Sequence, residues 1–162
     1  MVVVKLKYFD EPDGIAARID LPISSASPLM VVVGDPTRKP ARRKDRKGQS
    51  QFRREILRNY GSKCCVSGDS VEALLEAAHI QPYIDERSNH PQNGICLRVD
   101  LHRLFDAGLL TITADFTIQI SGILAGTTYG ALAGTRIRLP SNSAHLPSIA
   151  AIHDRNAVEF RA

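Results

Sequence analysis

The sequence predicts an α+β fold in which two short strands and one helix form a ββα unit inside a small mixed domain. Three stretches predict it: an apolar run over residues 74–80, a second over residues 94–97, and a helix-like pattern over residues 101–105 with its apolar positions on one side. At 162 residues, with 43% hydrophobic and 23% charged residues, the chain can bury one modest core. A β-rich extension is expected to precede this domain.

The first strand is expected to end at His79. The apolar run stops at His79 and Ile80, because Gln81, Pro82 and the polar residues 85–92 cannot continue a buried strand. His79 should therefore lie at a strand end and face a loop. Taken alone, a histidine beside an apolar strand is more often a structural residue than a catalytic one.

The helix that follows the second strand carries two potential metal ligands. Asp100 is placed to cap this helix and Gly108 to end it. His102 and Asp106 are four residues apart, so an imidazole nitrogen and a carboxylate oxygen would converge on one helical face. Such a pair is also compatible with a simple surface ion pair.

The order and spacing of three polar residues favour a catalytic site. Asn93 follows His79 by fourteen positions, and His102 follows Asn93 by nine. Asn93 with Gly94 would by itself indicate only a turn. Together with the strand and helix context, the set supplies a base that can activate water and a place for a divalent cation, which is what phosphodiester hydrolysis needs.

These residues resemble the HNH endonucleases of the ββα-metal type, most closely the restriction-type subgroup. The resemblance extends from residue 48 to residue 160, and its most specific segments are EAAHIQP and NGICLRVDLHRLFDAGLLTI. It implies that His79 is the general base and that His102 is a metal ligand. It also implies that Asn93 belongs to the catalytic set by fixing the loop between the strands, with direct metal ligation left open. Asp106 occupies a place where related nucleases often have another ligand.

Two departures from the family pattern concern metal binding. Ala78 stands where many members carry a ligand immediately before the first histidine, so waters and the substrate phosphate would complete the shell. Cys64 and Cys65 are adjacent and Cys96 is alone, which does not give a four-cysteine zinc set. The expected cofactor is a divalent metal, Mg or Mn, while the mixed nitrogen and oxygen donors also suit Ni, Co or Zn.

A basic segment precedes the ββα unit, which is called the finger below. Between Arg38 and Arg58 there are ten Lys or Arg against two acidic residues, whereas the whole chain has a net charge of only +4. Such a run can bind phosphates, although it can equally be a solvated linker. The resemblance adds Gln49 and Arg53, at the start of the first helix, as structural or substrate contacts. The nucleic-acid-binding candidates are Arg42, Arg43, Lys44, Arg46, Lys47, Gln49 and Arg53.

The chain is expected to divide into an N-terminal β-rich extension over residues 1–37, a basic linker over 38–47 and an HNH nuclease domain over 48–162. A helix should begin near Ser50. After the finger, the sequence predicts a hairpin over residues 109–121 and a short strand over 137–140. A C-terminal helix from about Pro147 should turn Ile149, Ile152 and Phe160 inward.

The sequence therefore predicts a metal-dependent DNA endonuclease from restriction or phage and defence biology. Ala78 keeps open an alternative, a nucleic-acid-binding module that retains the HNH fold without catalysis, and a structural metal finger is a third reading. DNA is the expected partner, and cleavage of both strands would suggest a homodimer. No apolar run approaches the length that spans a membrane, so a cytoplasmic location is expected.

Overall fold

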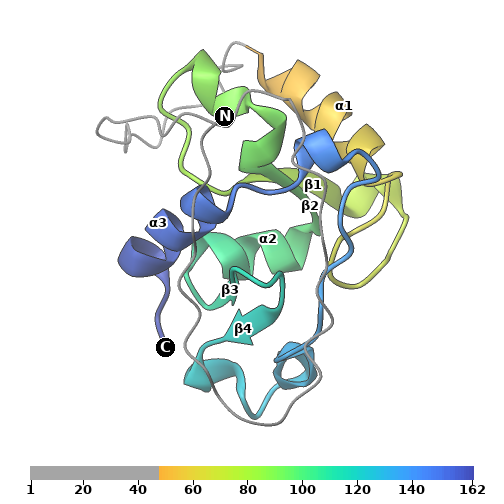
Figure 1. The fold of residues 1–162 in the computed structure, drawn as a ribbon. Helices are drawn as coiled ribbons and strands as arrows, with labels where there is room; N and C mark the ends of the chain where they lie inside the picture. Colours follow the sequence, from red (N-terminus) through yellow and green to blue (C-terminus); the bar gives the residue numbers. More distant parts are fainter. Residues whose placement is uncertain (1–47) are drawn as a thin grey trace, which may run out of the picture.

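The computed structural model describes residues 48–162 (Figure 1). The expected N-terminal strands and the linker, with Arg42, Arg43, Lys44, Arg46 and Lys47, lie outside the described residues. The predicted α+β fold is confirmed. The helices and strands are α1 (Gln49–Asn59), β1 (Leu75–His79), β2 (Gly94–Arg98), α2 (Val99–Asp106), β3 (Leu110–Ile112), β4 (Ile118–Ile120) and α3 (Ile149–Glu159), with short 3-10 turns between several of them.

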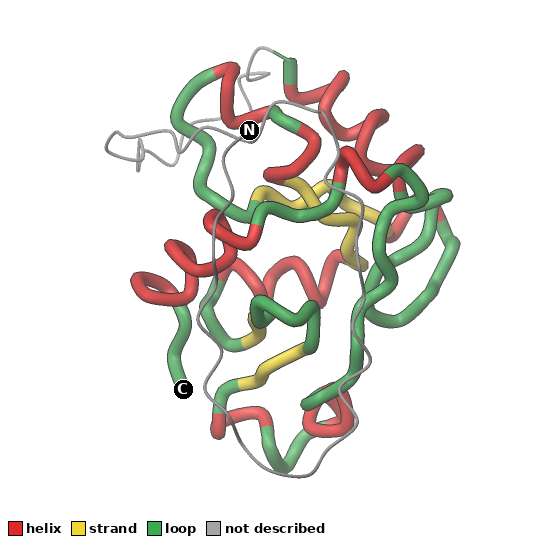
Figure 2. Tube along the Cα trace, viewed as in Figure 1, coloured by secondary structure: helices red, strands yellow, loops and turns green. Residues whose placement is uncertain are grey.

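The two strands of the finger are antiparallel and lie between two helices (Figures 1 and 2). Their register pairs Leu75 with Arg98 and His79 with Gly94. Because side chains alternate along a strand, His79 and Glu76 project from opposite faces of β1. The His79 ring packs on α1, while Glu76 reaches α2. The finger helix α2 and the preceding helix α1 therefore cover opposite faces of the hairpin.

Gly94 allows α1 to pack directly against β2. A Cβ atom at this position would lie 2.4 Å from Cδ1 of Ile56 and 2.7 Å from Cζ of Phe52, and both of these side chains are buried. Gly94 has an extended φ of −136°, so the backbone could accept another residue. The glycine after Asn93 is thus required by close packing of the core, in addition to any preference for a turn.

The region after the finger agrees with the sequence in part. The predicted hairpin is confirmed as β3 and β4, which pair Leu110 with Ile120. The predicted strand over 137–140 is wrong, because no strand forms there, and the isolated bridge beside it joins Thr117 to Arg136. Within residues 48–162, no helix has the length and apolar character needed to cross a bilayer.

The C-terminal helix α3 buries a different face from the one predicted. Ile152 is buried as expected, but Ile149 is 53% exposed and Phe160 is only half-buried. The residue that enters the core is Arg155, at 6% exposure. Ile152 and Arg155 lie three residues apart and share one side of the helix, whereas Ile149 lies in the first turn at the surface.

Candidate active site

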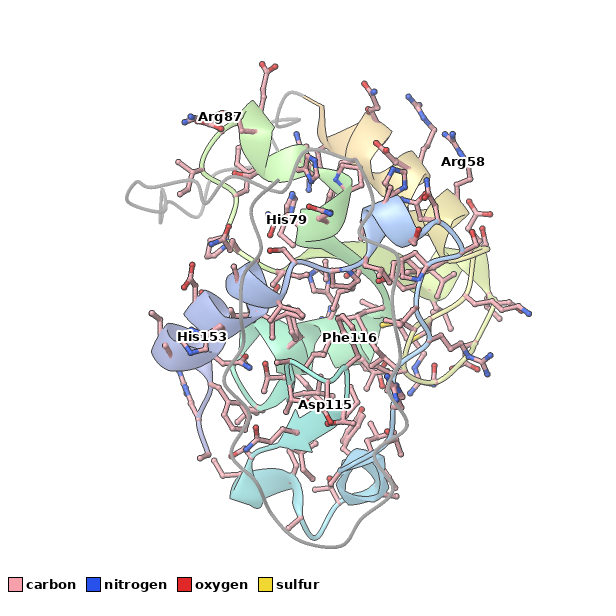
Figure 3. All side chains as sticks on the ribbon, viewed as in Figure 1. Arg58, His79, Arg87, Asp115, Phe116 and His153 are labelled. Atoms are coloured by element: carbon pink, nitrogen blue, oxygen red, sulfur yellow. The ribbon has the colours of Figure 1, made fainter. Side chains whose placement is uncertain are left out.

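His79 is the last residue of β1 (Figure 3). Neighbouring side chains contact its ring from several sides. The ring stacks on Phe52 of α1, with centroids 4.1 Å apart and planes inclined by 9°. Tyr83 contacts it edge-on at 5.9 Å. His79 Nε2 lies 3.1 Å from Oδ1 of Asn89, a residue of the loop between the strands. The imidazole is therefore held in one orientation at the end of the strand.

Asn93 ties both ends of that loop together. Its side chain is 1% exposed, and its Oδ1 accepts a hydrogen bond from the backbone N–H of Gln81 at 2.8 Å. Its Nδ2 donates to the carbonyl oxygens of Ser88, at 2.9 Å, and Gln81, at 3.2 Å. Since both ends of the amide bond to the backbone of the loop, this geometry suits a residue that fixes the loop better than a direct metal ligand.

His102 lies between two carboxylates on the opposite face of the hairpin. Its Nδ1 is 2.7 Å from Oε2 of Glu76 on β1, and its Nε2 is 3.4 Å from Oδ2 of Asp106, one turn later on α2. The His102 side chain is 20% exposed and that of Asp106 is 61% exposed. The structure thus brings His102 and Asp106 together, as the spacing indicated. It also places the Glu76 carboxylate against the other ring nitrogen of His102.

The chemistry of this donor set fits a cation. When neutral His102 donates its Nδ1 proton to Glu76, its Nε2 presents a lone pair toward the Asp106 carboxylate. Two acceptors then face each other across 3.4 Å, and a cation between them would relieve their repulsion. A carboxylate behind the second nitrogen is the usual arrangement around a metal-bound histidine, because it sets the tautomer and the ring orientation.

The position before His79 offers no ligand. Ala78 is fully buried on the face that packs against α2. Within residues 48–162, no cluster of three His, Cys, Asp or Glu side chains could hold a metal ion. Any cation at His102 and Asp106 would therefore complete its coordination with water and substrate oxygens.

The buried cysteines are part of the core beside β2. Cys64 Sγ accepts hydrogen bonds from the backbone N–H groups of Ser67, at 3.5 Å, and Arg98, at 3.3 Å. Burial raises the pKa of Cys96 to about 12 and holds the pKa of Cys65 well above its usual value. Cys65 and Cys96 are therefore protonated thiols at neutral pH, unsuited to nucleophilic attack.

Arg155 joins the strand end to the helix end. Its guanidinium donates to the carbonyl oxygen of Ile80 at 3.0 Å and to that of Phe105 at 2.5 Å, and it lies 3.8 Å from the centroid of the Phe105 ring. Ile80 directly follows His79, and Phe105 directly precedes Asp106. The candidate base and the candidate ligand Asp106 are thus attached to backbone segments that one side chain connects.

The described nucleic-acid candidates differ in their surroundings. Gln49 is exposed in the first turn of α1. Arg53 is half-buried, and its guanidinium donates to the carbonyl oxygens of Leu75 and Glu72, which attaches α1 to the start of β1. Arg54 is exposed on the same helix. Arg53 thus makes a structural contact, which is one of the two roles that the resemblance implies for it.

Asp100 does not cap α2 as expected. The N-cap position belongs to Arg98 and has no side-chain cap, while Asp100 lies inside the first turn. Its carboxylate accepts hydrogen bonds from Arg98, at 2.6 and 2.8 Å, and from the Tyr129 hydroxyl at 2.9 Å. Arg98 chiefly, with Tyr129, holds the pKa of Asp100 well below its usual range. Asp100 therefore serves to connect the finger to the segment around Tyr129.

The fold and this set of side chains define a ββα finger with histidine, asparagine and histidine in the HNH order. Residues 64–113 match the model of a family described as HNH endonuclease, and this segment contains both strands and the helix of the finger. The match confirms the resemblance to HNH endonucleases for this part of the chain.

One solved structure with a similar fold is a modification dependent TagI restriction endonuclease. The alignment has a TM-score of 0.52 and 20% sequence identity, and it covers 67% of this chain and 37% of that chain. At this identity the likeness concerns the fold alone, and the chain corresponds to little more than a third of that protein's length. Comparison with curated proteins gave no match.

Sequence patterns do not indicate the contacts that Glu76, Asn89 and Arg155 make in the site. The sequence predicts a surface position for Glu76, with assistance to the metal as the lesser alternative, yet strict alternation from Ala78 places it on the face that receives α2. Asn89 was one polar residue among many in the loop. Arg155 had no signal, because a basic residue in a C-terminal helix is usually exposed. His153 is exposed on α3 (Figure 3).

Proposed function

We propose that this chain is a metal-dependent DNA endonuclease of the HNH type. The observation that carries the proposal is the position of His102, whose Nε2 lies 3.4 Å from Oδ2 of Asp106 while its Nδ1 lies 2.7 Å from Oε2 of Glu76. This arrangement lies in a segment that matches the HNH endonuclease family. His102 and Asp106 would hold the cation, and Glu76 would orient His102.

A divalent cation bound there would stabilise negative charge on the scissile phosphate and on the departing 3′ oxygen. Mg or Mn is the expected ion, and the nitrogen ligand makes Mn at least as suitable as Mg, with Ni, Co or Zn also compatible. Two protein donors leave most coordination positions to water and to the DNA. This is the pattern that a catalytic site requires.

His79 would act as the general base. Its ring would accept a proton from a water molecule that attacks the phosphate opposite the leaving oxygen, which yields a 5′-phosphate and a 3′-hydroxyl. Phe52 and Asn89 keep the ring in place, and Asn93 keeps the loop in place. His79 projects from the face of the hairpin that packs on α1, whereas the candidate cation ligands His102 and Asp106 belong to α2, which covers the opposite face. The scissile phosphate would therefore lie across the end of β1, near the connection made by Arg155.

The basic segment before α1 would bind the DNA backbone together with Gln49. Arg53 would contribute as far as its hydrogen bonds to the carbonyl oxygens of Leu75 and Glu72 leave its guanidinium accessible. The residues of this segment are Arg42, Arg43, Lys44, Arg46 and Lys47. A role in restriction or defence, in the cytoplasm, is part of the proposal, and the restriction endonuclease of similar fold supports it. Because one finger cuts one strand, double-strand cleavage would require a homodimer or two successive events.

A nucleic-acid-binding module without catalysis is the second candidate. It is favoured by the buried Ala78 at a position where many family members have a ligand, and by the lack of a three-donor cluster in residues 48–162. Such a protein would bind DNA with a steep dependence on salt but would not cut it.

Nicking of supercoiled plasmid in Mg, Mn, Ni or EDTA separates the two candidates. The substrate should be prepared with and without methylated bases, and wild type should be compared with His102→Ala and with His153→Ala, an exposed histidine outside the finger. The proposal predicts nicking that EDTA abolishes, that His102→Ala lacks and that His153→Ala retains. DNA binding without nicking in any metal, or nicking that survives EDTA, would contradict it.

A further inference from the structure

Asn89 is the loop residue that holds the candidate base. It closes the 3-10 turn Glu86–Asn89, and its Oδ1 lies 3.1 Å from His79 Nε2. An amide oxygen can only accept a hydrogen bond, so this contact requires a proton on Nε2. In the neutral imidazole the proton is then absent from Nδ1, which becomes the basic nitrogen of the ring.

The position of Asn89 is itself determined by two neighbours. Asn93 Nδ2 donates to the carbonyl oxygen of Ser88 at 2.9 Å and so fixes the peptide group that enters Asn89. Gly48 lies against the Asn89 amide on the other side, where a Cβ atom would be 2.9 Å from Nδ2. Gly48 also has a φ of 82°, in the left-handed region that favours glycine. The backbone before α1 and the loop between the strands thus confine this one amide.

The Phe52 ring, which stacks on His79, further restricts the imidazole. Phe52 is buried and nearly parallel to His79, so it restricts tilting of the imidazole but not the identity of the protonated nitrogen. A hydrogen bond to one specific nitrogen is needed for that selection, and Asn89 makes it. Orientation and tautomer are therefore controlled by different side chains.

We propose that Asn89 is a positioning residue that keeps His79 in its Nε2-protonated tautomer. The inference rests on the proposed function for its catalytic consequence. The tautomer itself can be observed without any cleavage. A group that fixes the tautomer of a catalytic histidine affects the rate even though it does not touch the substrate.

Long-range ¹H–¹⁵N correlation spectra of the full chain at pH 8 test the tautomer directly. The chain has five histidines, so the His79 signals are assigned by their loss in His79→Gln. The proposal predicts a protonated Nε2 in wild type and a mixture of tautomers in Asn89→Ala, with Asn142→Ala as a control asparagine of another 3-10 turn. A protonated Nδ1 in wild type, or the same tautomer in Asn89→Ala, would overturn it.

Cleavage kinetics test the catalytic consequence separately. Asn89→Ala should lower the single-turnover rate roughly tenfold, which is part of the hundredfold or more that a positioned base contributes, without weakening DNA binding. Asn89→Asp retains the acceptor and should restore the tautomer, while its added charge shifts the acidic limb of the pH–rate profile upward. If the wild type shows the expected tautomer but no cleavage, the proposed function fails and the positioning contact stands. If Asn89→Ala cleaves like wild type, the positioning role fails.

Discussion

Replacing Arg155 by methionine should destabilise the domain, because this side chain connects the ends of β1 and α2. Arg155 is buried and donates hydrogen bonds to the carbonyl oxygens of Ile80 and Phe105, and its Nη1 lies 2.9 Å from Oε2 of Glu159. Methionine keeps much of the volume and removes every donor. The two carbonyl oxygens would then be left without the guanidinium.

The expected loss follows from these contacts. A hydrogen bond to a charged group contributes about 1.5–3 kcal/mol, and the contact with the Phe105 ring about 0.5–2 kcal/mol. Methionine also removes a buried charge, which offsets part of the lost stability. Burial lowers the pKa of Arg155, because it disfavours the charged guanidinium. We expect a net decrease of about 3 kcal/mol in the free energy of unfolding.

Urea denaturation followed by circular dichroism measures this difference. Arg54→Met is the matched control, because Arg54 is exposed on α1 and should change the stability by less than about 0.5 kcal/mol. The reasoning would be refuted if Arg155→Met were as stable as this control. Since Arg155 also joins the segments next to His79 and Asp106, the variant should lose nicking activity even at temperatures where it remains folded.

Three further changes have defined outcomes. Gly94→Ala places a Cβ 2.4 Å from Cδ1 of Ile56, so it should lower the free energy of unfolding by about 1–3 kcal/mol in urea denaturation, and unchanged stability would argue against the tight contact. Glu76→Gln should weaken Mn binding roughly tenfold in titration calorimetry, because it removes the charge behind His102, and an unchanged affinity would exclude that role. Burial, aided by a neighbouring histidine, lowers the pKa of His90 from its ordinary 6.5, so protons favour the unfolded state and stability should decline as the pH falls below about 6.5. His90→Asn retains a capping acceptor and should show a flatter pH dependence in denaturation series; an identical slope would contradict this assignment.

The local elements of the finger could be predicted from the sequence because each has its own periodic signal. The apolar run that ends at His79, the short run after Asn93 and the spacing of Leu101 and Phe105 correspond to β1, β2 and α2. The pairing of His102 with Asp106 followed from helical geometry alone. These contacts join residues that are near in sequence or belong to one element.

The remaining parts of the site depend on contacts between distant residues. Arg155 reaches Ile80 across 75 positions, and Glu76 reaches His102 across 26. Asn89 meets His79 across ten positions, in a loop that Asn93 holds by a hydrogen bond to the carbonyl oxygen of Ser88. The strand predicted over 137–140 also depended on a distant partner, and the structure has only an isolated bridge beside it, between Thr117 and Arg136. Hydrophobic periodicity does not encode which polar side chains converge after folding.

The most direct test of the proposed function is the single-turnover rate of plasmid nicking in Mn by wild type and by His79→Ala. If His79 is the general base, the nicking rate of His79→Ala should be lower by roughly a hundredfold or more, with DNA binding and folding unchanged. Equal rates for the two proteins would contradict the assignment of His79 as the general base.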